Sequence, residues 1–146
     1  MKLVVDHSAL EREIETGFRR SCEDVRGTAA ENAPVSVTRG AGLNVGSVQG
    51  GLRASISVTD VRHDGAGWHA RVGSPLRHAM QREFGGPILP VRGNLLHWVD
   101  PVTGEDRFAK RVMQRPGGPR QGYRPWLRPA GDKFPEFMDQ HLGRIT

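Results

Sequence analysis

Residues 8–30 read SALEREIETGFRRSCEDVRGTAA, and this stretch decides what the rest of the chain must cover. Apolar or small residues recur in it at steps of four or three: Leu10, Ile14, Phe18, Cys22, Val25 and Ala29. That spacing places them on one face of an α-helix, while charged residues occupy the opposite face. Pro34 disfavours helical backbone at the residue before it. We therefore predict a helix over residues 8–30 with one apolar stripe.

The segment 52–72 predicts a β-hairpin. Apolar and polar residues alternate on both sides of residues 63–67, HDGAG, which contain the glycines of a turn. Ile56 and Val58 belong to the first alternating run, and Trp68 and Val72 to the second. We expect Leu52 to open the first strand.

The second half of the chain predicts a short helix, a second hairpin and a last helix. Ser74-Pro75 is typical of a helix start and Gly85-Gly86 of a helix end, with Phe84 expected in the core. Residues 94–112 form the second hairpin around the turn sequence DPVTG at 100–104. A loop rich in Pro, Gly and Arg follows over 113–125, and the C-terminal helix spans 131–142.

This order of elements predicts one α+β domain over residues 1–146. It contains no β-α-β alternation, so a parallel sheet is not expected. We predict a long N-terminal helix (8–30) and a C-terminal helix (131–142) packed on an antiparallel sheet of hairpins with long loops. The sheet and the short helix together span 52–112.

The composition leaves little material for a large core. Apolar residues make up 36% of the chain, which contains 19 Gly and 10 Pro. Either parts of the chain are disordered when it is alone, or neighbouring subunits complete its faces.

The chain is basic, with a net charge of +5. The stretch from Arg107 to Arg128 contains seven basic residues and no acid. This stretch is either a solvated loop or a functional basic face, and side-chain counts leave both open.

No pattern of reactive residues points to an enzyme. The single cysteine, Cys22, excludes an internal disulfide, and the six histidines include no i, i+4 pair that would share a helix face. The acidic residues are scattered, so we expect no catalytic residue, no metal and no cofactor. We also expect no signal peptide and no membrane span, and therefore synthesis in the cytoplasm.

Three segments in order resemble the HK97 gp10-like family of phage head–tail joining and tail-completion proteins. They are Ala33-Pro34 followed by residues 51–56, GLRASI; residues 72–86, VGSPLRHAMQREFGG; and residues 124–130, RPWLRPA. The resemblance runs from about residue 10 to residue 142. His78 stands where the family pattern has Tyr, Trp126 where it has Phe, and Gly86 where Thr is common, and residues 87–122 form a long insertion.

The resemblance implies a structural virion protein rather than an enzyme. It implies a homo-oligomeric ring, expected as a hexamer, in the neck or tail of a phage. The partners would be the head connector and the tail tube, with genomic DNA in the lumen. We expect the assembly interface to include Leu52, Arg53, Glu83, Phe84, Arg115, Arg120, Arg124, Trp126 and Arg128.

Two of these residues allow two interpretations each. Glu83 is either a solvated acid at a helix end or an ion-pair partner of Arg53 or Arg128. Trp126 is either an aromatic anchor at an interface or a core residue beneath the last helix.

A second function also fits the composition. The basic stretch would suit a sequence-independent nucleic-acid-binding protein, whose affinity for DNA would fall steeply with salt.

Overall fold

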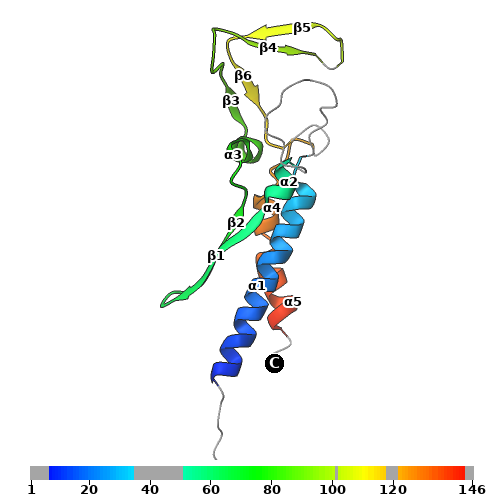
Figure 1. The fold of residues 1–146 in the computed structure, drawn as a ribbon. Helices are drawn as coiled ribbons and strands as arrows, with labels where there is room; N and C mark the ends of the chain where they lie inside the picture. The colour runs from blue at the N-terminus through cyan, green and yellow to red at the C-terminus, as the bar shows by residue number, and fades with distance from the viewer. Residues whose placement is uncertain (1–6, 35–50, 101, 118–121, 144–146) are drawn as a thin grey trace, which may run out of the picture.

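The computed structural model describes residues 7–34, 51–100, 102–117 and 122–143. It is an elongated α+β chain, and helix α1 (His7–Asn32) runs along most of its length (Figure 1). The predicted N-terminal helix is confirmed, and its buried residues are Gly17, Phe18, Ser21, Cys22, Val25 and Ala29. Leu10 remains 38% exposed, because α1 extends beyond the elements that cover its middle. No helix among the described residues is long and apolar enough to cross a membrane.

The first predicted hairpin is confirmed as β1 (Ser57–Asp64) and β2 (Gly67–Gly73), which pair antiparallel. Its turn is fixed by Asp64, whose Oδ1 accepts the Ala66 N–H at 2.8 Å. The prediction that the first strand begins at Leu52 is wrong, since residues Gly51–Ser55 form the short helix α2. A strand would bury Ala54 together with Leu52 and Ile56, whereas the helical turn leaves Ala54 exposed.

Helix α3 (Arg77–Phe84) begins two residues later than the Ser74-Pro75 signal predicted. The Ser74 hydroxyl instead accepts the Leu76 N–H at 3.2 Å and lies 2.6 Å from the Ser55 hydroxyl. Ser74 therefore links the end of α2 to the start of α3. Gly85 ends the helix with a φ of 70°, as expected.

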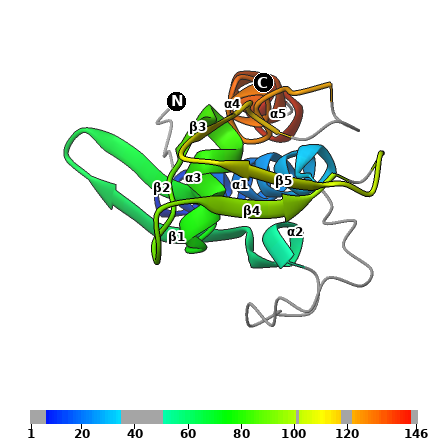
Figure 2. The same cartoon turned by 90° about the horizontal axis from the view of Figure 1, so that it is seen from above.

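A long ribbon of two ladders connects α3 to the C-terminal part (Figures 1 and 2). The predicted second hairpin is confirmed as β4 (Leu96–Val99) paired with β5 (Asp106–Ala109). A shorter ladder, β3 (Gly86–Ile88) with β6 (Val112–Gln114), lies between this hairpin and α3. It was not predicted, because three-residue strands are too short to show alternation. The described strands thus form three separate two-stranded sheets, not the single sheet that was expected.

The prediction of one C-terminal helix over 131–142 is wrong in its start and its continuity. The structure has α4 (Arg128–Gly131) and α5 (Phe134–Leu142), separated by Asp132 and Lys133. Pro135 explains the break, since proline has no N–H and cannot continue the hydrogen-bond ladder from α4. It is tolerated at the start of α5, where that N–H has no helical partner.

The core lies along the C-terminal half of α1. Helix α1 contacts α4 and α5 along one side and the β1–β2 hairpin along another (Figure 2). The main cluster of buried side chains joins four regions of the chain: Val25, Ala29, Ala33, Leu52, Ile56, Ala79, Trp126 and Ala130. Where α5 lies against α1, His141 of α5 pairs with Asp24 of α1 at 2.6 Å.

Candidate assembly interface

The structure separates the predicted interface residues into a buried and an exposed group. Leu52, Glu83 and Trp126 are at most 4% exposed. The exposed residues are Arg53, Phe84, Arg115, Arg124 and Arg128. Arg120 lies outside the described residues. The interface prediction is therefore wrong for the three buried residues, whose side chains are enclosed within one chain.

Glu83 binds three consecutive backbone N–H groups at the start of α4. Its Oε2 accepts the N–H of Trp126 at 2.8 Å and of Leu127 at 2.7 Å, and its Oε1 accepts the N–H of Arg128 at 2.9 Å. Both earlier interpretations of Glu83 are wrong: the side chain is not solvated, and its described partners are backbone groups instead of a guanidinium. A carboxylate with several N–H donors makes strong, charge-assisted hydrogen bonds.

Trp126 is a core residue, as one of its two interpretations proposed. It is 1% exposed, and its indole Nε1 donates a hydrogen bond to the Ala79 carbonyl at 3.4 Å. The Asn32 side-chain amide donates to the Trp126 carbonyl at 3.5 Å. Trp126 thus connects the end of α1, α3 and α4 within one chain.

Arg82, which the sequence did not predict as a site residue, binds the segment between β6 and α4 near its other end. Its Nη1 donates to the Gly117 carbonyl at 3.2 Å, and its own carbonyl accepts the Gly117 N–H at 2.5 Å. With its side-chain oxygen turned toward Arg82, Gln114 accepts from Nη1 at 2.9 Å and from Nε at 3.2 Å. Adjacent residues of α3 therefore fix both ends of the segment between β6 and α4. We call this pair of residues, Arg82 and Glu83, the α3 clamp.

Gly117 allows two parts of the chain to approach each other closely beside the clamp. Its φ is 63°, and a Cβ atom at this position would lie 2.2 Å from the Arg124 carbonyl oxygen. Only glycine combines that backbone conformation with such a close approach. The loop is therefore narrow where Gly117 meets Arg124.

The exposed arginines are less free than their sequence suggested. Arg53 donates to the carbonyls of Glu31 at 3.2 Å and Ala33 at 3.4 Å, near the end of α1. The guanidinium of Arg128 lies 5.6 Å from the centre of the Phe84 ring. Arg115 lies at a similar distance, 5.4 Å, from the Tyr123 ring. These contacts hold Arg53 at the end of α1, Arg128 beside Phe84 and Arg115 beside Tyr123.

Phe84 does not fill the core, contrary to the prediction, and is 60% exposed. The buried residues of α3 are Ala79 and Glu83, four positions apart. Phe84 follows Glu83 and is turned by about 100° around the helix from that buried side. Phe84 and Arg128 together present an aromatic and cationic surface to the outside.

The ribbon exposes many large apolar side chains. Phe108 is 62% exposed, Val99 56% and Trp98 39%, all on the β4–β5 hairpin. His97 stacks on Phe108 with ring centres 4.7 Å apart and pairs with Asp106 at 2.6 Å, so one side of the hairpin is ordered. A lone two-stranded hairpin is marginally stable in water. The ribbon therefore gains stability when another protein surface packs on its exposed apolar side chains.

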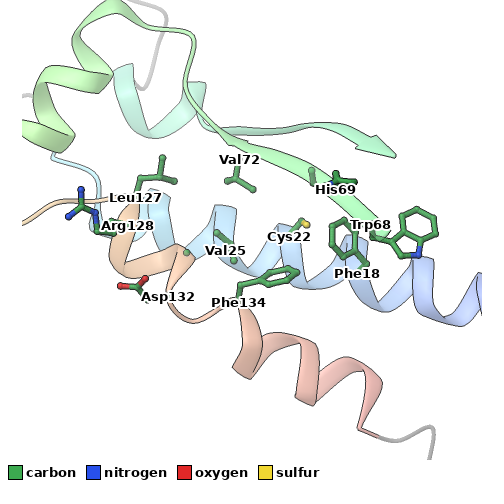
Figure 3. A pocket seen from close by; sticks show the side chains of 12 residues that line it. Phe18, Cys22, Val25, Trp68, His69, Val72, Leu127, Arg128, Asp132 and Phe134 are labelled. Atoms are coloured by element: carbon green, nitrogen blue, oxygen red, sulfur yellow. The ribbon is translucent and has the colours of Figure 1, made fainter. Parts of the chain in front are cut away.

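An apolar groove lies between α1, β2 and the α4–α5 pair (Figure 3). Its volume is about 550 Å³, and its lining includes Phe18, Cys22, Val25, Trp68, Val72, Leu127, Arg128, Asp132 and Phe134. Phe18 contacts both Trp68, at 5.8 Å between ring centres, and Phe134, at 5.7 Å. Burial raises the pKa of the Cys22 thiol, and the Glu23 carboxylate raises it further. The thiol therefore stays protonated near neutral pH. Cys22 is a buried residue of the groove lining, which agrees with its position in the apolar stripe of α1.

Metal-ligating side chains do not cluster among the described residues. No group of three or more His, Cys, Asp and Glu side chains there is placed to hold a metal ion. The described His–carboxylate contacts are pairs on separate elements: His69 with Asp64, His97 with Asp106, and His141 with Asp24.

Comparison of the chain with models of protein families, with curated proteins and with solved structures finds no match.

Proposed function

We propose that this chain is a structural subunit that assembles with copies of itself into the ring that joins tail to head in a tailed phage. The observation that best supports assembly is the ribbon over residues 86–114, which extends from the body of the chain (Figure 1). Large apolar side chains of this ribbon are exposed. Large apolar side chains exposed together are typical of protein–protein contact sites.

The more specific role in a phage neck rests on the resemblance of three segments to head–tail joining proteins. Those segments are far apart in the sequence but meet in one core. Ala33, Leu52, Ala79 and Trp126 belong to the same buried cluster, and Glu83 binds the backbone at Trp126. The shared sequence pattern is therefore explained by packing within the subunit. The ring contacts would use the parts that differ, above all the ribbon.

This role is mechanical and uses no catalytic group. The partners we propose are further copies of the chain, expected as six in a ring, together with the head connector and the tail tube. The protein would be made in the host cytoplasm and would function in the virion, with DNA passing through the ring. The net charge of +5 per copy favours contact with DNA or with an acidic neighbouring ring.

The first test is the mass of the purified chain in solution, measured by light scattering over a range of concentrations and followed by particle imaging. We expect a discrete closed species of several copies, whose images give the symmetry. A chain that remains monomeric at every concentration would contradict self-assembly of the chain alone.

The same samples distinguish the second candidate, a basic nucleic-acid-binding protein. That function predicts binding of duplex DNA by the monomer, with log affinity falling linearly with log salt. Part of the basic stretch is already neutralised, since Arg107 pairs with Asp100 at 3.5 Å and Glu105 at 3.2 Å. Tight DNA binding without assembly would favour this second function over the ring.

A further inference from the structure

We propose that the β4–β5 hairpin of one copy docks into the apolar groove between α1, β2 and the α4–α5 pair of the next copy. This inference rests on the proposed self-assembly and names the two surfaces that meet. The hairpin supplies exposed apolar side chains, and the groove supplies an apolar recess of about 550 Å³. That volume lies within the roughly 300–1,000 Å³ of sites that enclose small ligands, enough to receive side chains of the hairpin.

The two surfaces are chemically matched. Phe108 and Val99 stand out of one face of the hairpin and Trp98 out of the other, and Phe18, Val72 and Phe134 are among the residues that line the groove. Trp68 and Arg128 are also in its lining, where they can contact the flanks of an inserted hairpin (Figure 3). Tryptophan and arginine are the residue types most enriched among those that dominate binding energies.

The hairpin cannot fill the groove of its own chain. Figure 1 places β4 and β5 beyond α3 at one end of the protomer, whereas β1, β2 and α5 lie toward the opposite end. A hairpin that occupies this groove must therefore come from another copy. Because hairpin and groove are different surfaces, their contact is heterologous, and repeated contacts of this kind generate a closed ring or an open filament.

The distribution of charge favours the same contact. Residues 95–109 contain three acids, Asp100, Glu105 and Asp106, and one base, Arg107. The hairpin's net charge of −2, subtracted from the chain's +5, leaves +7 on the remainder. An acidic hairpin is thus attracted to the basic body of a second copy, which speeds their encounter. The groove lining itself carries one base, Arg128, and one acid, Asp132, and adds no net charge of its own.

Disulfide cross-linking tests the contact directly. In a Cys22→Ala background, one variant carries Val102→Cys in the hairpin turn, where Val102 is 91% exposed, and a second carries Asp132→Cys in the groove lining. The matched control replaces Asp132→Cys by Arg77→Cys, at an exposed position on α3. Circular dichroism and light scattering establish that each variant folds and assembles before mild oxidation.

We expect a mixture of the two single variants to give disulfide-linked dimers, at least ten-fold more than the mixture with the Arg77→Cys control. A chain carrying both Val102→Cys and Asp132→Cys should give a ladder of linked species that ends at the size of the ring. Assembly without this cross-link, or a stronger cross-link with Val102→Cys alone, would overturn the inference and leave self-assembly intact. Absence of any assembled species at every concentration would count against the proposed function itself.

Discussion

The Glu83 carboxylate accepts the backbone N–H of Trp126 at 2.8 Å, although the two residues are 43 positions apart in the chain. This bond and its two neighbours at Leu127 and Arg128 fix the start of α4 on α3. The Trp126 side chain then enters the core from the same point, with its Nε1 on the Ala79 carbonyl. The carboxylate therefore positions the aromatic residue through the backbone instead of contacting its ring.

Replacing Glu83→Gln should destabilise the protein by roughly 2–3 kcal/mol, since the amide loses the charge and turns an NH₂ group toward backbone donors. Urea unfolding measures the change. The matched control is Glu136→Gln, an exposed position on α5, which should change stability by no more than about 0.5 kcal/mol. Equal effects of the two substitutions would contradict the three buried hydrogen bonds.

Two tryptophans in different surroundings should respond differently to the same substitution. Trp126→Phe removes a buried indole and its hydrogen bond to Ala79, so we expect a loss of about 1–3 kcal/mol. Trp98→Phe, on the exposed hairpin, should leave the unfolding midpoint of the monomer unchanged. A stable Trp126→Phe variant with wild-type unfolding would show that Trp126 does not belong to the core.

Substitutions at Gly117 and Gly122 allow the cost of backbone strain to be measured apart from the cost of steric overlap, because both residues have a φ of 63°. A Cβ at Gly117 would overlap the Arg124 carbonyl, whereas a Cβ at Gly122 meets nothing within 4 Å. Gly122→Ala should cost about 1 kcal/mol for the left-handed conformation, and Gly117→Ala about 3 kcal/mol. Thermal unfolding of the two variants gives the comparison, and similar losses would mean that the loop relaxes freely away from Arg124.

Cys22 should make the stability fall at alkaline pH. Its folded pKa is raised above the ordinary value of 9.0 by burial, so above that pH the unfolded thiol loses its proton while the folded thiol retains it. The folded state then binds more protons, and the free energy of unfolding decreases as pH rises. The unfolding free energy of the wild type minus that of Cys22→Ala, followed from neutral pH to about pH 10.5, isolates the thiol from other titrating groups. The difference should decline above pH 9.0, and a rise there would contradict the direction of the shift.

The same thiol should react slowly with an alkylating reagent near neutral pH, because burial limits access and suppresses the thiolate. Mass spectrometry of native and urea-unfolded protein measures the two rates. Rapid labelling of the native protein would indicate that the groove opens around Cys22.

The sequence predicted the elements with strong local patterns. The stripe on α1 and the two hairpins carry their periodicity within a few residues, so their existence was predictable. The ladder β3–β6 was not, because Gly86 and Gln114 pair across a long intervening segment and each strand has three residues. The break at Asp132 and Lys133 could have been inferred from Pro135, which lies within the predicted helix 131–142.

The residues of the α3 clamp were harder to predict, for a physical reason. Apolar preference favoured Phe84 over Glu83 as the core residue of α3, and the donors that stabilise a buried carboxylate belong to a distant backbone segment. The spacing of Leu76, Ala79 and Glu83, three and four residues apart, was the available signal, since it places Glu83 on the buried side. Arg82 has no comparable local signal, because its partners Gln114 and Gly117 are more than thirty residues away.

The contact of α1 with α4 and α5 determines when the protein can fold during its synthesis. Part of the cover of its apolar stripe comes from α4 and α5, and Trp126 lies 94 positions after Asn32 at the end of α1. A nascent chain therefore leaves Phe18 without its partner Phe134 until α5 has been made, and transiently exposed apolar surface of this kind is prone to aggregation. Complete folding thus waits for α4 and α5, and a product truncated before Trp126 would be a substrate for proteases instead of a competitor for assembly.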